Sequence, residues 1–403
     1  MKSGERKYLN GIGYVYYFTK ESINPHKAAD LIHALNVKSV RSWHNATWVL
    51  KDPGTLNREE SDGFHNMYRL LFKAGVEQII GLSHDWFLPL EDGTFSWGKS
   101  QVPRRDTAPG SKYIQFLDMY EGMWETLVKE FPEVTDWETG NEMNHKPFLK
   151  PLNEKDGKDE TGFTQEEMAD ICTDMMFRSA RAIHKCNPDA GVIMPGMAPV
   201  GEREIGVFAE NIAIEYNGMI HTLERIYRNI KSGEFGSENP RDFFDALCWH
   251  PYYAEQDEKG DWHWKKPDET WIKLNREVYE VAERAGDHGL SCYLSEYGFN
   301  DYGDTENDKL LADYLSEGLR LVRECMPFVE SVHVYRMFQA LAGTDELDNY
   351  SIFDLRDGKI FPKYKAYAVQ KQYGGTGLLF EDGSQDGTGG AYNELVGGGM
   401  YDG

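Results

Sequence analysis

The residues best suited to do chemistry are two glutamates, Glu142 and Glu296, each of which closes a short apolar stretch of the chain. Neither lies in a run of charges, and Asn141 comes directly before the first. Carboxylates at strand ends on opposite sides of one closed sheet can approach to about 5 Å, the separation used by retaining glycosidases. The pair is therefore a candidate for acid/base and nucleophilic chemistry.

Other polar and aromatic side chains are predicted near the same strand ends. We expect Asn141 to bind a sugar 2-hydroxyl, His250 to hold a hydroxyl or the nucleophile, and Arg41 to stabilise charge. Either Tyr252 or Tyr297 is expected to donate a hydrogen bond to a carboxylate oxygen. The expected substrate-binding residues are Arg41, His44, His84, Trp86, Asn141, His250, Tyr252 and Tyr335.

The two glutamates need different protonation states. To protonate a departing oxygen near neutral pH, Glu142 should have a pKa raised by burial and by its ionised partner. Glu296 must stay ionised to act as a nucleophile. Glu138, four residues before Glu142, is expected to be a buried structural carboxylate paired with a basic neighbour.

Strand-like and helix-like stretches alternate along the chain eight times, which predicts one (β/α)₈ barrel because parallel strands need helical crossovers. The reacting groups of such a barrel lie at the carboxyl ends of its strands. The expected strands are residues 11–18, 37–44, 76–83, 134–140, 190–197, 245–253, 291–298 and 329–338. The expected helices are residues 24–36, 58–75, 111–131, 164–186, 204–232, 269–286, 307–325 and 361–374. A doubly wound sheet is the alternative, but no glycine-rich phosphate loop follows any strand.

At this point a family resemblance becomes visible. WETGNEMN (137–144) resembles the acid/base segment of clan A retaining glycoside hydrolases, and LSEYG (294–298) is similar to their nucleophile strand. ALCWHPYY (246–253) resembles the strand-six segment that carries a His or Tyr beside the nucleophile. Arg41 matches the strand-two arginine, and residues 350–373 are similar to the closing segment of the clan. The resemblance covers almost the whole barrel and, within the clan, is greatest to glycoside hydrolase family 39.

The resemblance implies a glycosidase that cleaves an equatorial, β-type bond by double displacement, without a metal ion or other cofactor. It makes Glu142 the acid/base and Glu296 the nucleophile. The sequence departs from the clan pattern at two places that affect the expected sugar preference and leave the two glutamates unchanged. Met143 replaces the usual Pro, and residues 335–338 replace a Trp that normally forms the floor of the −1 subsite.

Composition limits the classes of binding partner that the protein can have. The chain has 43 Lys and Arg against 67 Asp and Glu, a formal net charge of −24, which argues against nucleic acid and anionic membranes and favours a neutral oligosaccharide or glycoside. No run of 18 apolar residues predicts a membrane span. Five scattered cysteines and an N-terminus that resembles a strand more than a signal peptide predict a cytoplasmic protein. Oligomerisation is compatible with the sequence.

Domain organisation is predicted to be simple. Residues 1–374 form the barrel, and residues 375–403 form a glycine-rich tail or docked extension; residues 374–403 contain 11 glycines. Long stretches at 84–110, 143–163 and 254–268 are expected to wall the site, which favours exo action on a short glycoside.

Two other functions stay open. The first is a metal-dependent barrel, such as a sugar isomerase or hydrolase, whose ligands would be His84, Asp85, Glu142, His250 and Glu296. The second is a carbohydrate-binding barrel that has lost catalysis.

Overall fold

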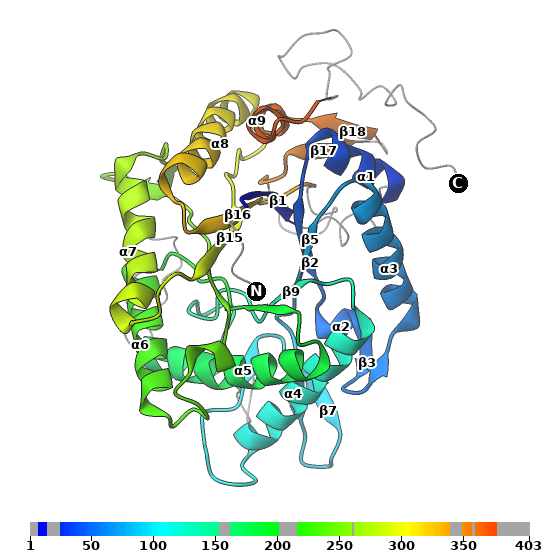
Figure 1. Ribbon diagram of the computed structural model, residues 1–403, viewed down its shortest axis with the longest axis vertical. Coiled ribbons are helices and arrows are strands. Elements are labelled where there is room, and N and C mark those ends of the chain that lie inside the picture. The colour runs from blue at the N-terminus through cyan, green and yellow to red at the C-terminus, as the bar shows by residue number, and fades with distance from the viewer. Residues whose placement is uncertain are drawn as a thin grey trace.

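The parallel strands close into an eight-stranded barrel in the order β1-β16-β15-β12-β11-β9-β5-β2. This computed structural model describes residues 7–13, 25–152, 162–200, 216–259, 262–338, 349–356 and 359–376. Helices surround the strands, as the view down the shortest axis shows (Figure 1). The predicted (β/α)₈ barrel is confirmed, and the doubly wound sheet is wrong.

The barrel strands are shorter than the sequence pattern predicts. Their polar carboxyl-terminal residues leave the hydrogen-bonded ladder and enter the loops where the candidate site lies. The strands are β1 (Leu9–Gly13), β2 (Ser39–Trp43), β5 (Gln78–Leu82), β9 (Asp136–Glu138), β11 (Gly191–Ile193), β12 (Ala246–Trp249), β15 (Ser291–Tyr297) and β16 (Val329–Val334). The first expected strand continued to residue 18, but residues 14–18 lie outside the described part of the chain.

The long helices agree closely with the amphipathic stretches, because their apolar faces cover the barrel. They are α1 (Pro25–Ala34), α3 (Arg58–Lys73), α4 (Lys112–Glu130), α5 (Gln165–Cys186), α6 (Asn217–Ser232), α7 (Glu269–Ala285), α8 (Thr305–Cys325) and α9 (Tyr364–Tyr373). Side-chain caps fix several starts: Thr164 forms a capping box with Glu167, and Asp268 accepts a hydrogen bond from the Trp271 amide. Residues 204–215 of the expected sixth helix are not among those described.

Short two-stranded sheets occupy the long connections, and the sequence did not predict them. One of them, the hairpin of β13 (Ala254–Gln256) and β14 (Trp262–Trp264), follows β12 and brings Trp264 back toward the barrel mouth. The other short elements are α2 (Ala46–Val49), η1 (Pro240–Asp242), β3 (Leu50–Asp52), β4 (Thr55–Leu56), β6 (Phe87–Pro89), β7 (Phe95–Trp97), β8 (Gln101–Val102), β10 (Lys150–Pro151), β17 (Phe353–Arg356) and β18 (Lys359–Pro362).

The interior of the barrel is polar at the amino-terminal ends of its strands. Ser39 donates a hydrogen bond to Gln78 at 2.7 Å, and the Gln78 amide donates to Asp136 at 2.9 Å. Tyr293 then donates to Glu330 at 2.9 Å. Because these buried groups satisfy one another, they fix the strands on which the residues of the candidate site stand.

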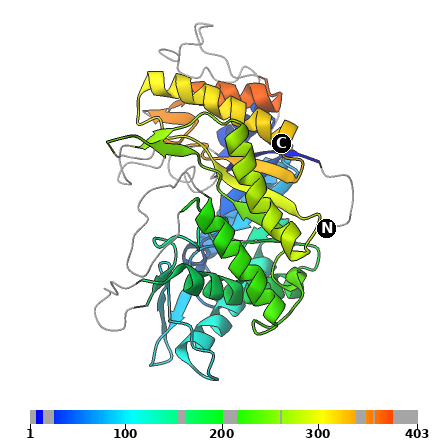
Figure 2. The same cartoon turned by 90° about the vertical axis from the view of Figure 1, so that its left-hand side faces the viewer.

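The last described helix, α9, packs beside α8 on the outside of the barrel. Helices α8 and α9 lie side by side in both ribbon views (Figures 1 and 2), and Gln372 donates a hydrogen bond to Ser316 at 2.7 Å between them. Apart from residues 375–376, the predicted glycine-rich tail lies outside the described residues.

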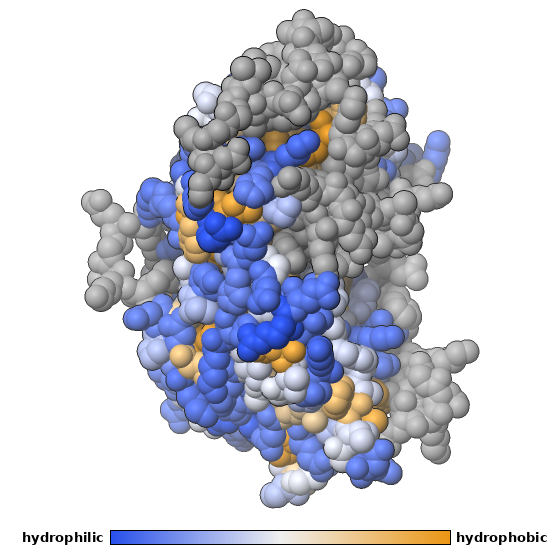
Figure 3. Space-filling view, turned by 90° about the vertical axis from the view of Figure 1, so that its right-hand side faces the viewer, coloured by the Kyte–Doolittle hydropathy of each residue, from blue (hydrophilic) through white to orange (hydrophobic). Residues whose placement is uncertain are grey.

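The surface agrees with the composition. Where it is described, the face shown in Figure 3 is mostly hydrophilic, with small separate hydrophobic patches. In the described ranges, no helix combines the length and the hydrophobicity that a membrane crossing needs. All five cysteines are free thiols.

Candidate active site

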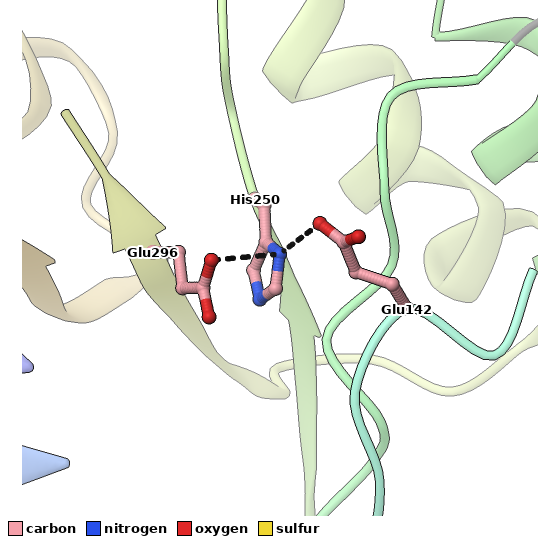
Figure 4. Close-up of side chains that lie close together, drawn as sticks. All are labelled: Glu142, His250 and Glu296. Carbon is pink, nitrogen blue, oxygen red and sulfur yellow. Dashed lines mark hydrogen bonds and ion pairs between the residues drawn. The ribbon is translucent and has the colours of Figure 1, made fainter. Parts of the chain in front are cut away.

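The structure brings the two predicted glutamates together at the mouth of the barrel. Glu296 stands near the end of β15, Glu142 lies in the loop after β9, and His250 follows β12 between them (Figure 4). Oxygen atoms of the two carboxylates and a ring nitrogen of His250 all lie within 4.8 Å of one another. This spacing agrees with the roughly 5 Å between the carboxyl groups of a retaining glycosidase.

His250 contacts both carboxylates through one atom. Its Nδ1 lies 2.8 Å from Oε1 of Glu142 and 3.7 Å from Oε2 of Glu296. The imidazole is fully buried, whereas the side chains of Glu142 and Glu296 are 12% and 8% exposed. The two carboxylates are therefore partly accessible, whereas the imidazole between them is not (Figure 4).

Arg41, buried on β2, connects Glu296 to a third carboxylate. Its guanidinium donates to Glu138 at 2.6 and 2.9 Å, to Glu296 at 2.5 Å, and to the side-chain oxygen of Asn141 at 2.8 Å. Glu138 is thus a buried structural carboxylate with a basic partner, as the sequence predicts. Such charge-assisted bonds hold Glu296 in one orientation.

The backbone around Glu142 is unusual. Glu142 has a φ of +47°, in the left-handed region that non-glycine residues rarely adopt. Its amide donates to the Gly196 carbonyl at 2.7 Å, and the His145 amide donates to the Glu142 carbonyl at 2.7 Å. Strained conformations of this kind persist where surrounding contacts impose them, and they cluster at functional sites.

His84, at the end of the β5 segment, supports this turn from below. The Asn141 amide donates to His84 Nδ1 at 3.0 Å, and His84 Nε2 lies 3.2 Å from the Ser100 hydroxyl. Burial lowers the pKa of His84 to about 3, so the ring is neutral, and the Asn141 amide requires Nδ1 to be the nitrogen without a proton. His84 therefore positions the Asn141–Glu142 turn by its backbone.

The protonation of Glu142 differs from the expected one. Burial raises its pKa, but hydrogen bonds and charges from His145 and His250 outweigh burial, so that the pKa falls well below its usual range. For His250, burial lowers the pKa, but the negative charges of Glu296 and Glu142 outweigh it and the pKa rises. The raised pKa predicted for Glu142 is therefore wrong for the free protein, because the proton of this pair resides on His250.

The aromatic residues predicted beside the carboxylates divide into two groups. Tyr252 donates to Glu296 Oε2 at 3.2 Å, and burial, aided by the nearby charge of Glu296, raises the pKa of Tyr335 to about 12. Tyr297 faces the opposite way, since a Cβ on Gly318 of α8 would meet its hydroxyl. Of the two expected tyrosine donors, the structure therefore places Tyr252 at the site.

Two predicted binding residues lie elsewhere. His44 is fully buried behind the barrel wall, where its ring stacks on Phe64 at 4.6 Å and burial lowers its pKa to about 3. Trp86 is 1% exposed, packs against α4, and donates from Nε1 to the Gln101 carbonyl at 2.7 Å. Both predictions are wrong, because these side chains belong to the packing between barrel and helices.

Sequence reasoning also missed residues that the structure places at the site. The ring of Tyr350 lies 5.4 Å from that of Tyr335 and 6.0 Å from those of Tyr252 and Trp264. The charges of Glu142 and Glu296 add to the effect of burial in raising the Tyr350 pKa. Tyr350 lies within the segment that resembles the closing part of the clan, but its role there had no signal in strand periodicity.

The arrangement bears on the metal-dependent alternative. Among the described residues, the group whose ligand atoms converge enough for an ion is Glu142, His250 and Glu296. The two further ligands of that alternative are used otherwise: His84 accepts the Asn141 amide, and Asp85 accepts hydrogen bonds from the Thr47 hydroxyl and the Trp86 amide. The predicted five-ligand site is therefore not formed.

Comparison with known proteins identifies the fold. No protein-family model matches the sequence, and no curated protein matches it either. The chain is similar in structure to the virulence factor SghA (TM-score 0.60, 13% identity, 92% of this chain and 96% of that one), solved with its substrate analog salicin. It is also similar to a glucosidase from Croceicoccus marinus (TM-score 0.56, 15% identity, 92% and 68%). A third similar structure is a β-glucosidase from Thermotoga maritima in complex with castanospermine (TM-score 0.55, 14% identity, 94% and 100%). At these identities the likeness establishes a shared barrel fold.

Proposed function

We propose that this protein is a clan A retaining glycoside hydrolase that cleaves a β-type glycosidic bond by double displacement. The observation that carries the proposal is the approach of the Glu142 and Glu296 carboxylates to within 4.8 Å at the barrel mouth. The fold shared with β-glucosidases supports the same chemistry.

Glu296 acts as the nucleophile. Arg41 and Tyr252 each donate a hydrogen bond to one of its two oxygens, which fixes its direction of attack. In the first step a Glu296 oxygen forms a bond to the anomeric carbon while the bond to the leaving oxygen breaks. Glu142 transfers a proton to that oxygen, so the leaving group departs as a neutral alcohol.

Water completes the reaction. Glu142, now ionised, accepts a proton from a water molecule whose oxygen attacks the anomeric carbon, and the bond to Glu296 breaks. Two inversions at the anomeric carbon give overall retention. Before the first step the proton passes from His250 to Glu142 through the 2.8 Å contact between them, and the proton taken from water returns to His250 by the same contact at the end of the cycle.

The charge of the site suits this route. Glu138, Glu142 and Glu296 bring three negative charges, against the Arg41 guanidinium and the single proton that Glu142 shares with His250. The carboxylates of this network outnumber its basic side chains, Arg41 and His250. A fixed negative field of this kind stabilises the positive charge that develops on the sugar in an oxocarbenium-like transition state.

We propose a small β-glycoside or short oligosaccharide as the substrate and exo action as the mode. Four aromatic side chains gather on one side of the carboxylates and offer apolar faces to a sugar ring: Tyr252, Tyr335, Tyr350 and Trp264.

We further propose that the chain is related to glycoside hydrolase family 39, although one of the similar solved structures is described as a family 1 β-glucosidase. Five free thiols favour a reducing, cytoplasmic location.

The test is hydrolysis of a panel of 4-nitrophenyl glycosides: β-glucoside, β-xyloside, β-galactoside, α-arabinofuranoside and α-arabinopyranoside. The configuration of the first-formed sugar is read by proton NMR, and retention is expected. Glu296→Ala and Glu142→Ala serve as the catalytic controls. Binding of these sugars without turnover would instead support the carbohydrate-binding barrel, and inversion would contradict double displacement.

A further inference from the structure

Ser295, directly before Glu296 on β15, lies beneath the candidate site, where it contacts three side chains. The residue is 1% exposed. The register of β15 against β16 shifts between Leu294 and Tyr297, an irregularity that re-aims side chains in a strand. Ser295 and Glu296 can therefore both serve the interior, although consecutive residues of a regular strand face opposite sides.

The hydrogen bonds at Ser295 Oγ can be assigned one by one. The hydroxyl lies 3.1 Å from Glu138 Oε1, 3.1 Å from His250 Nε2 and 3.0 Å from Cys248 Sγ. Both oxygens of Glu138 accept hydrogen bonds from Arg41, so Glu138 is the acceptor and Ser295 the donor in the contact between them. A hydroxyl has one proton, and Oγ therefore accepts from His250 and from the Cys248 thiol.

This assignment determines the tautomer of His250. Its Nε2 must carry a proton in order to donate to Ser295, so Nδ1 is the atom that gains and loses a proton. Nδ1 is the atom 2.8 Å from Glu142. When the ring is neutral, the lone pair of Nδ1 points at Glu142, and the contact is favourable only if the carboxyl group holds the proton.

The space in which the side chains of Glu138, Ser295 and His250 meet is narrow. The Gly196 amide donates to Glu138 Oε1 at 3.2 Å, and its Cα faces the place where the three side chains meet. A Cβ added at Gly196 would lie 2.4 Å from His250 Nε2, 2.8 Å from Glu138 Oε1 and 2.9 Å from Ser295 Oγ. Any larger residue would separate these groups, so the contact requires glycine here.

We infer that Ser295 is a positioning residue which, through Glu138, holds the Nε2–H tautomer of His250 and so keeps one transferable proton in the contact between His250 Nδ1 and Glu142. The contacts of Glu138, Ser295, His250 and Glu142 form one continuous chain from the buried arginine to the mouth of the barrel. The kinetic part of this inference rests on the proposed function, because it gives Glu142 the proton that a leaving group needs. The tautomer itself does not depend on the reaction.

The first test is the dependence of the rate on the leaving group. At a pH where the ring of Ser295→Ala is neutral, its one proton can lie on Nδ1 and be donated to an ionised Glu142, so that the pair holds no proton to transfer to a leaving group. We expect kcat/KM to fall by about 10-fold to 100-fold for an alkyl glycoside, since one hydrogen bond to an ionisable group is lost. The same variant should stay within about twofold on a 2,4-dinitrophenyl glycoside, whose phenolate departs without a proton.

Ser331→Ala is the matched control, because Ser331 is a fully buried serine on the neighbouring strand β16 that bonds only to the Leu9 carbonyl among the described contacts. It should change neither substrate selectively. Ser295→Thr retains the hydroxyl and should recover the wild-type dependence on the leaving group. Equal losses on both substrates in Ser295→Ala, or no loss on either, would overturn the kinetic inference while the glycosidase proposal stands.

The second test needs no activity. In protein labelled with ¹⁵N-histidine, long-range proton–nitrogen spectra report which ring nitrogen is protonated, and His250→Gln identifies the His250 signal. At a pH high enough to neutralise the ring, the wild type should show the proton on Nε2, and Ser295→Ala should show a large fraction on Nδ1. A wild-type proton on Nδ1, or an unchanged ratio in the variant, would overturn the inference even if no substrate were found.

Discussion

Arg41 and Glu138 form an ion pair inside the barrel, where both side chains are fully buried and Arg41 Nε lies 2.6 Å from Glu138 Oε2. The same guanidinium reaches Glu296 at 2.5 Å. A single arginine thus joins a structural carboxylate to the proposed nucleophile. This dual attachment makes Arg41 a residue on which stability and catalysis both depend.

Arg41→Ala should therefore lose activity and stability together. Removing the guanidinium leaves buried carboxylates without a partner, which costs about 3–5 kcal/mol of unfolding free energy. Thermal unfolding and kcat/KM of the same preparation measure the two losses. In Arg41→Ala combined with Glu138→Gln, part of the stability should return because one unpaired charge is gone, while turnover should stay low. An Arg41→Ala protein that unfolds early but turns over normally would show that Arg41 is structural only.

The two glutamates should separate by role when replaced. Glu296→Ala should be nearly inactive on every substrate, and added azide should restore turnover only by giving a glycosyl azide of inverted configuration. Glu142→Ala should retain much of its glycosylation rate on an activated aryl glycoside, and azide should then give a product of retained configuration. NMR of the glycosyl azides distinguishes these outcomes. The opposite pattern would exchange the two roles, and unimpaired hydrolysis in both variants would contradict a glycosidase.

Strand periodicity predicted much of the fold and part of the site. Glu296 and Arg41 were found because they end apolar strands, and the structure places both in the interior. The alternation of side chains along a strand also explains why His44 lies outside the site. It follows Arg41 by three residues and therefore faces the helices, where it contacts Phe64. The same parity places Tyr297 opposite Glu296. Applied strictly, alternation could have removed both residues from the candidate set.

Other features had no signal in periodicity. Glu142 lies beyond the end of β9 in a turn with a positive φ, so only the motif around it indicated a site. Trp86 follows β5 into a loop whose path no pattern specifies. Ser295 joins the site because the β15 register shifts, and Tyr350 reaches it from a loop after β16. These positions depend on tertiary contacts between segments far apart in the chain.

The Glu142–His250 pair should stabilise the fold in a limited range of pH. The lowered pKa of Glu142 stabilises the fold at pH values above the pKa of an unfolded glutamate, and this stabilisation is lost as the pH falls through the folded pKa. The raised pKa of His250 stabilises the fold below about pH 6.5, the pKa of an unfolded histidine, and this stabilisation is lost as the pH rises through the folded pKa. The benefit over His250→Gln should therefore be largest near pH 5–6 and decline at alkaline pH. Urea unfolding of both proteins across pH measures it, and a difference independent of pH would contradict the pairing.

Chelation should leave activity unchanged. The proposed mechanism uses two carboxylates, and His84 and Asp85, which the metal-dependent alternative requires, are bonded to the backbone and side chains around them. Dialysis against EDTA, followed by assay with and without added Zn²⁺ or Mg²⁺, measures this. Activity lost on dialysis and regained with a metal would support the alternative.

Tyr350 should contribute to substrate binding more than to the chemical step. Its ring lies beside those of Tyr335, Tyr252 and Trp264, and an aromatic face at a sugar site stabilises the bound ring in ground and transition states alike. Loss of uniform binding raises KM and leaves kcat nearly unchanged. Tyr350→Ala should therefore raise KM by about fivefold to tenfold, corresponding to roughly 1 kcal/mol of stacking. Tyr350→Phe retains the ring and should stay close to wild type. If Tyr350→Phe loses as much as Tyr350→Ala, the hydroxyl carries the contact, and if kcat falls while KM holds, the residue acts on the transition state instead.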